Sequence, residues 1–361
     1  MNALLEKLKK NSSVKEAEIL AKSKFFNDKD MVVTPIPALN VALSGRLDGG
    51  LTSGLTTVAG VSRVFKSGFC LVMAKAYMDK YPDSALLYFD SEFGTPRGYF
   101  ETFNIDTSRV LHVPVTDIEM LKFDIMKQLE GINRGDRVII VIDSVGNLAS
   151  RKEVEDALDG KSVADMTRAK SLKSLFRMVT PHLNIKNIPM LVINHVYQEL
   201  ALYPRTILGG GTGNVYSSDT IFIVTRQQEK DGTDIAGYNF VITIDKSRFV
   251  REKSKIPINV MFEGGISKYS GLMDMALEAG VVQKPNQGWY SRMDFATGAL
   301  EDKKWRMKDT NCKEFWDPIL KSRTFQDWVK NNYQVASGSI MDDNDIDQAM
   351  NAVPVDVIGK V

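Results

Sequence analysis

Short apolar runs rich in β-branched residues recur along the middle of the chain, and helical patterns separate the first four of them. The runs cover residues 55–60, 85–90, 137–143, 189–195 and 219–225. Helices are predicted over 66–80, 117–133 and 163–183, and the second of these places Ile118, Leu121, Ile125 and Leu129 on one face. Strands that alternate with helices predict an α/β fold in which helices cover a mostly parallel central sheet.

Two further strand-like runs, 238–245 and 256–262, have no helix between them, so we expect them to extend the sheet as antiparallel edges. The predicted core therefore spans residues 34–268. The composition then changes, because residues 269–330 contain all four tryptophans. This stretch predicts a small C-terminal domain.

The first 33 residues have the pattern of two short helices. Ser13 and Glu16 have the spacing of a capping box at the start of the second helix, where each side chain bonds a free backbone N–H of the other residue. That helix leads into Phe25 and Phe26, whose rings dock either on their own molecule or on a neighbour. Residues 1–33 are therefore a candidate arm for contact between protomers.

The composition is that of an ordinary soluble globular protein, with 43% hydrophobic and 25% charged residues. Cys70 and Cys312 form neither a disulfide framework nor a metal-ligand spacing, which favours a reducing, cytoplasmic setting. The N-terminus lacks the apolar core of a secretory signal. No apolar run approaches the ~20 residues of a membrane span, so no membrane contact is expected.

The charge of the chain is unevenly placed, although its formal net value is only +1. Residues 331–361 contain five aspartates and one lysine, so this stretch carries −4 and the preceding 330 residues carry +5. We expect an acidic flexible tail here. Such a tail either competes with a polyanion for a basic groove or only adds solubility.

Residues 60–68 read Gly-Val-Ser-Arg-Val-Phe-Lys-Ser-Gly and nearly match a phosphate-binding loop, in which a second glycine precedes Lys-Ser. Gly60, Lys66 and Ser67 fit the pattern, whereas Phe65 stands at the glycine position. The stretch follows a predicted strand and precedes a predicted helix, as such a site requires. A left-handed backbone at Phe65 would cost about 1–2 kcal/mol. The segment is either a working nucleotide site or a turn that happens to contain Lys-Ser.

In a working loop, Lys66 would bridge the β- and γ-phosphates of ATP and Ser67 would ligate Mg²⁺. The other candidate nucleotide-binding positions of the loop are Gly60, Ser62, Arg63, Phe65 and Gly68.

Two acids follow predicted strands. Asp143 ends the run 137–143, where a carboxylate can support Mg²⁺, and Glu92 lies just past the run 85–90, where it can polarise an attacking water. Taken alone, Asp143 could be an ordinary aspartate at the end of a buried strand, and Glu92 an ordinary solvated acid in a loop.

Several further motifs follow one another along the chain. They are Asp-Ser-Glu at 90–92 with Tyr99 seven residues after Glu92, VIIVIDSVGNL at 138–148, LVINH at 191–195, GGGTGN at 209–214, and the pair Lys246 and Arg248. In order and spacing they resemble RecA-type recombinases, and within them the UvsX recombinases of T-even-type phages. The likeness covers about residues 20–330. It implies a RecA-like P-loop ATPase core with a short helical N-terminal arm and a small C-terminal domain. It also implies that Phe65 belongs to a working site, since the UvsX loop has phenylalanine there.

The resemblance assigns roles to individual residues. It implies that Lys66, Glu92, Asp143 and His195 are catalytic, and that Tyr99 stacks on adenine. His195 stands where RecA relatives have a glutamine that senses the γ-phosphate. Lys246 and Arg248 would cross a head-to-tail interface to the γ-phosphate of a neighbour.

Two segments resemble, by their position, the DNA loops of the family. Residues 196–214 are long and glycine-rich, and residues 151–162 are basic at both ends. The candidate DNA-binding residues are Arg151, Lys152, Lys161, Arg168, Tyr197, Tyr203, Arg205, Gly209, Gly210, Gly211, Gly213 and Asn214.

The expected function is ATP-dependent strand exchange by helical filaments on single-stranded DNA, with duplex DNA as the second substrate. A loading mediator and a single-strand-binding protein are expected partners, and the host cytoplasm is the expected location if a phage encodes the chain. Two alternatives remain open at this point: a ring-forming helicase on the same core fold, and a nucleotide-gated binding module without strand exchange.

Overall fold

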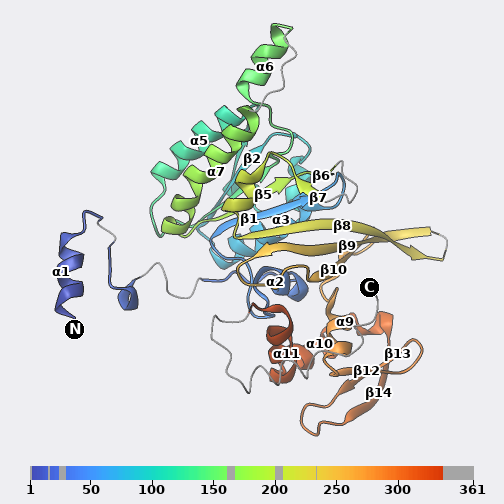
Figure 1. Cartoon of the computed structure of the whole chain (residues 1–361). Coiled ribbons are helices and arrows are strands. Elements are labelled where there is room, and N and C mark those ends of the chain that lie inside the picture. Colours follow the sequence, from blue (N-terminus) through green and yellow to red (C-terminus); the bar gives the residue numbers. More distant parts are fainter. Residues whose placement is uncertain are drawn as a thin grey trace, which may run out of the picture.

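The computed structural model describes residues 2–14, 17–23, 30–160, 167–199, 206–232 and 234–335. Its centre is a nine-stranded sheet with the strand order β11-β10-β9-β8-β1-β5-β4-β2-β3 (Figure 1). The parallel strands are β1 (Gly54–Gly60), β2 (Ala85–Asp90), β3 (Val110–Pro114), β4 (Val138–Asp143), β5 (Pro189–Asn194) and β8 (Thr220–Asp231). The antiparallel edge consists of β9 (Asp234–Ser247), β10 (Lys255–Met261) and β11 (Gly265–Ile266).

The predicted strands and their directions are confirmed, with two differences. Strand β8 continues six residues beyond the predicted end at 225 and forms a long ribbon with β9 (Figure 1). Strand β3 was not predicted. It lies at the edge of the sheet and is only half-buried, so it lacks the continuous apolar run of the central strands.

Helices cover both faces of the sheet (Figure 1). On one face lie α2 (Pro37–Ser44) and α3 (Lys66–Lys80), and on the other lie α5 (Ile118–Gly131) and α7 (Thr167–Lys186). Successive residues of β2 belong to different cores: Leu86 and Tyr88 pack with the first pair of helices, and Leu87 and Phe89 with the second. Burial on both faces explains the continuous apolar runs of the sequence.

Four parallel strands run in the same direction, so the chain segments that follow them lie at one end of the sheet, beyond the C-terminal ends of the strands. β1, β2, β4 and β5 end in Gly60, Asp90, Asp143 and Asn194, and Asp90 is the register partner of Asp143. The loops that follow these strands therefore meet, and the candidate active-site residues lie at this end of the sheet.

The N-terminal arm is only partly as predicted. α1 (Ala3–Asn11) is the first predicted helix, and Figure 1 shows it standing apart from the core. The second predicted helix is wrong for the described residues, because only a 3₁₀ turn at Leu20–Lys22 forms there. Ile19 before this turn is extended and no side chain caps it. Glu16 of the predicted capping box and the pair Phe25 and Phe26 lie outside the described residues.

The C-terminal region combines helices with a three-stranded sheet of its own. It contains α9 (Leu272–Glu278), β12 (Val282–Asn286), β13 (Trp289–Met293), β14 (Leu300–Arg306), α10 (Lys313–Lys321) and α11 (Arg323–Tyr333). The tail begins later than predicted, because Gln334 bridges Val250 and the Val335 N–H donates to the Phe249 carbonyl. Residues 331–335 are thus part of the folded unit, and the rest of the predicted tail lies outside the described residues.

The remaining elements are short. They are α4 (Arg97–Thr102), α6 (Arg151–Leu158), α8 (Thr212–Ser217), the hairpin of β6 (Val196–Gln198) and β7 (Thr206–Leu208), and 3₁₀ turns at Thr107–Arg109 and Met307–Thr310. Within the described part of the chain, no helix has the length and apolar character needed to cross a membrane.

Candidate active site

The loop between β1 and α3 adopts the conformation that the phosphate-loop interpretation requires. Phe65 precedes the first residue of α3 with φ 63° and ψ 24°, in the left-handed region. Arg63 is also left-handed, with φ 62°. The loop therefore has the backbone conformation for which glycine is usually chosen, at two positions that are not glycine.

Packing of the Phe65 ring compensates for this strain. The ring stacks on Phe240 of β9 with centroids 5.3–5.4 Å from both Phe240 and the edge-on Phe69, and it also contacts Phe103. A Cβ atom on Gly68 would lie 2.5 Å from the ring. Aromatic pairs contribute about 0.5–1.5 kcal/mol each beyond their burial, which is enough to offset a left-handed residue.

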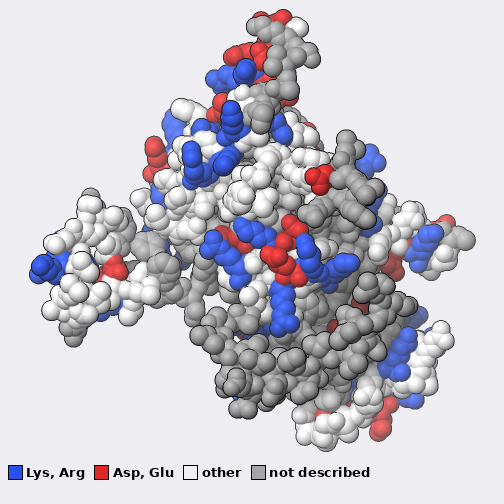
Figure 2. Space-filling view, viewed as in Figure 1, with Lys and Arg blue, Asp and Glu red and all other residues white. Residues whose placement is uncertain are grey.

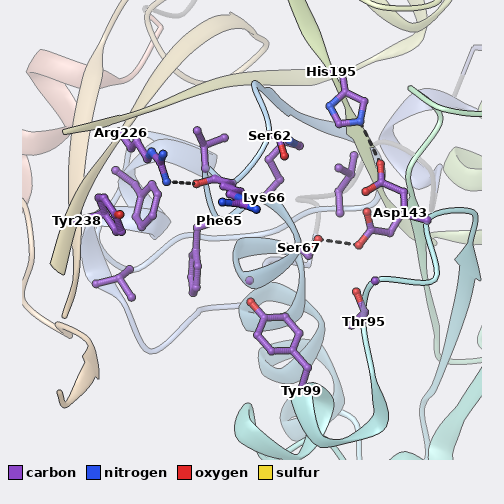
Figure 3. A pocket seen from close by; sticks show the side chains of 18 of the residues that line it. Ser62, Phe65, Lys66, Ser67, Thr95, Tyr99, Asp143, His195, Arg226 and Tyr238 are labelled. Atoms are coloured by element: carbon purple, nitrogen blue, oxygen red, sulfur yellow. Dashed lines mark hydrogen bonds and ion pairs between the residues drawn. The ribbon is translucent and has the colours of Figure 1, made fainter. Parts of the chain in front are cut away.

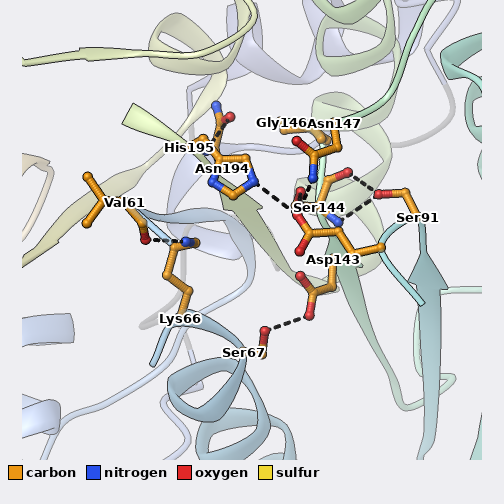
Figure 4. A network of polar contacts seen from close by, with 12 residues as sticks. Val61, Lys66, Ser67, Ser91, Asp143, Ser144, Gly146, Asn147, Asn194 and His195 are labelled. Carbon is orange, nitrogen blue, oxygen red and sulfur yellow. Dashed lines mark hydrogen bonds and ion pairs between the residues drawn. The ribbon is translucent and has the colours of Figure 1, made fainter. Parts of the chain in front are cut away.

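Lys66 lies against its own loop. Its Nζ donates to the carbonyls of Gly60 at 3.1 Å and Val61 at 2.8 Å, and the residue is 7% exposed (Figure 4). Burial lowers the pKa of Lys66, while the carboxylates of Glu92 and Asp143 oppose that shift. The ammonium is thus held where the loop encloses it.

Asp143 connects three elements at the sheet edge. Its Oδ2 accepts a hydrogen bond from Ser67 Oγ on α3 at 2.7 Å (Figure 4). The same oxygen accepts from Tyr88 Oη on β2 at 2.8 Å. Burial raises the pKa of Asp143, and these two hydrogen bonds oppose the rise. The pair of Ser67 and Asp143 therefore exists as predicted.

Glu92 is held by three side chains through one oxygen. Its Oε1 accepts from Ser144 Oγ at 2.5 Å and Asn147 Nδ2 at 3.0 Å, and His195 Nε2 lies 3.0 Å away (Figure 4). The hydrogen bond with His195 lowers the pKa of Glu92, the bond from Ser144 adds to this, and burial opposes it. Glu92 is therefore kept ionised beside the phosphate loop. Sequence analysis placed Glu92 and His195 here, but not Ser144 or Asn147.

The phosphate loop, Glu92 and Asp143 line one cavity of about 700 Å³, together with His195 and Tyr99 (Figure 3). The rest of the lining was not predicted: it includes Arg226 of β8, Tyr238 and Phe240 of β9, Val260 of β10, and Phe262, which follows β10. Arg226 donates to the Arg63 carbonyl at 3.1 Å and lies over the Tyr238 ring at 4.8 Å. These residues belong to no sequence motif, and only the order of the strands in the sheet places them beside the phosphate loop.

Lys246 and Arg248 do not line this cavity. Lys246 Nζ donates to the carbonyl of Val215 at 2.7 Å, and Arg248 Nε is 2.8 Å from Asp219. Both lie beside the start of β8, whereas the phosphate loop follows the end of its parallel neighbour β1. Their predicted role at a neighbour's phosphate stays a prediction.

The candidate DNA segment at 151–162 is a helix rather than a loop over its described part. Arg151 and Lys152 begin α6, which Ser150 and Glu153 cap reciprocally and which projects from the core (Figure 1). Both residues are exposed. Lys161, Tyr203 and Arg205 lie outside the described residues.

The glycine run after the β6–β7 hairpin has a packing role that sequence analysis missed. Gly209, Gly210, Gly213 and Asn214 are buried. A Cβ on Gly210 would lie 2.5 Å from the Leu172 side chain, and a Cβ on Gly213 would lie 2.5 Å from the backbone of α7. Thr57 Oγ1 donates to Asn214 Oδ1 at 2.8 Å. These four residues therefore pack within the chain, and their predicted contact with DNA stays a prediction, as does that of Gly211 and Tyr197, which are exposed.

Arg168 has contacts within the chain that sequence analysis did not predict. Its guanidinium is half-buried and donates to the main-chain carbonyls of Val145, Gly146 and Leu148. These contacts hold the loop after β4, and the predicted DNA contact of Arg168 stays a prediction. On the face drawn in Figure 2, basic and acidic side chains of the described residues are interspersed rather than gathered in one basic surface.

The fold and this cavity define a P-loop protein that binds a nucleotide at the edge of a mostly parallel sheet. The chain belongs to the RecA family: the model of the RecA N-terminal domain matches residues 5–267. The model of the C-terminal domain of the bacteriophage T4 recombination and repair protein matches residues 269–329.

Individual relatives agree with the family models. The chain is 51% identical to the recombination and repair protein of Enterobacteria phage T4 over 353 residues, which cover 97% of this chain and 90% of that protein. It is 24% identical to the RecA protein of Rhodococcus jostii over 298 residues, covering 81% and 84% of the two chains. It is 28% identical to the RecA protein of a Nocardioides species over 207 residues, covering 56% and 57%.

Proposed function

We propose that this chain is an ATP-dependent DNA strand-exchange recombinase that forms helical filaments on single-stranded DNA. Membership of the RecA family makes it a recombinase and a DNA-dependent ATPase. The helicase alternative gains no support from the relatives described above, which carry the names of recombination proteins. The observation that carries the proposal is the contact of Glu92 with His195, because it joins the ATPase cavity to the hairpin that His195 precedes.

The residues of the phosphate loop fit a nucleoside triphosphate. Lys66 provides a buried ammonium, and the N-terminus of the 15-residue α3 provides free N–H groups beside it. Nucleotide binding would exchange the Lys66 contacts with the Gly60 and Val61 carbonyls for stronger, charge-assisted bonds to phosphate oxygens. We therefore assign ATP as the nucleotide.

Ser67 and Asp143 fit Mg²⁺, because their hard oxygen donors lie 2.7 Å apart. Among the described residues, no group of three or more His, Cys, Asp or Glu side chains could hold a metal. An ion at this position would take its other ligands from phosphate and water. When bound, it would neutralise charge that develops on the transferred phosphoryl group.

Glu92 is the group we assign to water activation. Its carboxylate faces the cavity and is kept ionised, so it can accept a proton from water at neutral pH. His195 contacts the same oxygen and lies at the start of the β6–β7 hairpin. A change in the conformation of that hairpin would therefore act on Glu92 through His195.

The base of the nucleotide would lie in the aromatic part of the cavity. Tyr99 lines this part from α4, and Tyr238 and Phe262 line it from the antiparallel edge. Flat rings offer stacking surfaces to adenine. Arg226, beside Tyr238, adds a cationic side chain that can reach the α- or β-phosphate side of the ligand.

Contacts between copies of the chain complete the proposal. Leu4, Leu5 and Leu8 on α1 are 43–60% exposed, and no residue of this helix is buried. An amphipathic helix that buries nothing in its own chain is suited to cover a neighbour. Lys246 and Arg248 would act at the neighbour's nucleotide, as in a head-to-tail assembly.

DNA would be held by the exposed candidates Arg151, Lys152, Tyr197 and Gly211. A loading mediator and a single-strand-binding protein are proposed as further partners, because filaments on single strands must compete with proteins that coat them. We also propose a cytoplasmic location.

Electron microscopy of the chain with single-stranded DNA and ATP tests the function. Helical filaments that form with ATP and disassemble on hydrolysis are expected, and strand transfer from a homologous duplex should accompany them. Closed rings that unwind duplex DNA would favour the helicase. DNA-bound particles that form neither assembly would leave only a nucleotide-gated binding module.

A further inference from the structure

We propose that Arg168 is a positioning residue for Glu92, which couples the start of α7 to ATP hydrolysis, and that it is not a DNA-phosphate ligand. The inference rests on the proposed ATPase role of Glu92. It concerns the loop of residues 144–148, which follows β4.

Arg168 is the second residue of α7 and grips this loop through its main chain. Its Nε donates to the Leu148 carbonyl at 2.7 Å, and its Nη2 donates to the carbonyls of Gly146 at 2.6 Å and Val145 at 3.1 Å. The planar guanidinium offers donors in a fixed fork, so three acceptors in one loop fix the loop's orientation. A point charge on a flexible stem cannot do the same.

The loop that Arg168 grips is the loop that holds Glu92. Ser144 Oγ and Asn147 Nδ2 both donate to Glu92 Oε1, at 2.5 and 3.0 Å (Figure 4). The third group on that oxygen, His195, packs against Gly146, where a Cβ atom would lie 2.2 Å from the imidazole. Every hydrogen bond described for the Glu92 carboxylate therefore comes from this loop or from a ring packed on it.

Other anchors of the loop come from rigid elements. The Val145 N–H donates to the Ile193 carbonyl of β5 at 3.0 Å, and the Ile118 N–H at the start of α5 donates to the Ala149 carbonyl at 3.0 Å. Arg168 adds the anchor from α7, the helix that follows α6 in the chain. A displacement of the start of α7 would thus reach Glu92 through Arg168.

Two substitutions separate positioning from charge. Arg168→Lys keeps the positive charge but loses the fork, and Arg168→Gln loses the charge and most donors. Arg177 is exposed on the same helix, so Arg177→Gln is the matched control for loss of an arginine. ATP turnover, nucleotide affinity, thermal midpoint and the salt dependence of single-strand affinity are measured on the full-length chain.

If Arg168 positions Glu92, both Arg168 variants should lose about 10- to 100-fold in kcat at saturating single-stranded DNA, because an angstrom-scale misplacement of a catalytic group has effects of that size. ATP affinity and the salt slope should stay within about twofold of the parent. Arg177→Gln should retain full kcat. Asn147→Ala, which removes one bond to Glu92 without touching Arg168, should reproduce part of the loss and combine non-additively with Arg168→Lys.

Three results would overturn the inference. A normal kcat in Arg168→Lys, with a salt slope reduced by about 0.7 in Arg168→Gln, would make Arg168 a phosphate contact. A parallel fall of nucleotide affinity and thermal midpoint in both variants would make its role purely structural. Additive effects of Asn147→Ala and Arg168→Lys would separate the two residues. Absence of DNA-stimulated ATPase in the parent chain would instead refute the proposed function itself.

Discussion

The close approach of the Phe65 ring to Gly68 predicts that Gly68→Ala changes stability in opposite directions in the parent chain and in the Phe65→Gly variant. Gly68 is the third residue of α3, and a Cβ there would lie 2.5 Å from Cε1 and Cζ of Phe65. The ring cannot retreat freely, because Phe69 and Phe240 enclose it. We therefore expect Gly68→Ala to destabilise the parent chain but to stabilise the Phe65→Gly variant.

The expected magnitudes follow from two opposing effects. Alanine is better than glycine in a helix by about 0.8–1 kcal/mol. Overpacking a filled site costs about 1–3 kcal/mol. In the parent chain the second effect dominates, whereas Phe65→Gly removes the ring and leaves only the first. The coupling free energy between the two positions should thus be about 1–3 kcal/mol.

Urea unfolding followed by circular dichroism, without DNA or nucleotide, measures the four free energies of this double-mutant cycle. Gly98 in α4 is the control, because a Cβ there would meet no atom within 4 Å. Gly98→Ala should be stabilising in both backgrounds. If Gly68→Ala has the same effect in the parent and in Phe65→Gly, to within about 0.5 kcal/mol, the ring does not hold the loop as described.

Three further predictions concern the proposed activity. Glu92→Gln should retain ATP and DNA binding but lose most turnover, whereas Lys66→Ala should weaken ATP binding and filament formation; equal loss of ATP affinity in both would contradict these roles. In a random, equal mixture of Glu92→Gln and Arg248→Ala, about a quarter of interfaces should regain full chemistry if Arg248 acts on a neighbour. DNA-stimulated ATPase no higher than the sum of the separate variants, in verified mixed filaments, would exclude that assignment. Deleting residues 336–361 should raise duplex affinity if the acidic tail competes with DNA, and an unchanged affinity would leave the solubilising interpretation.

The parts of the fold that the sequence predicted are those with strong, repeated physical signals. Central strands such as β4 and β5 are buried on both faces, so their apolar runs are continuous. Strand β3 escaped prediction because it is half-exposed at the sheet edge. The N-terminal arm shows the opposite failure: a capping signal at Ser13 and Glu16 predicted a helix, but among the described residues only the turn Leu20–Lys22 forms, and none of its three residues is buried.

The candidate site divides along the same line. Lys66, Glu92 and Asp143 could be brought together from sequence because the ends of parallel strands meet at one edge. Arg226 and Tyr238 could not, since their place beside the loop depends on β8 pairing with β1 and on β9 pairing with β8. The packing of the glycine run at 209–214 on α7 could not be predicted, because the same composition suits both a flexible loop and close packing on a helix.

The phenylalanine in the phosphate loop also changes what the antiparallel edge does. Phe65 packs on Phe240, and the same strand, β9, carries Lys246 six residues further along, about 20 Å at ~3.3 Å per residue. In a chain with glycine at position 65, this ring contact with β9 would be absent. Here β9 contacts the nucleotide loop of its own subunit through Phe240 and carries Lys246, and Arg248 follows the strand by one residue. If Lys246 and Arg248 reach the next subunit as proposed, a shift of β9 imposed at Lys246 would reach Phe65, and the phenylalanine that obscured the motif would connect successive nucleotide sites.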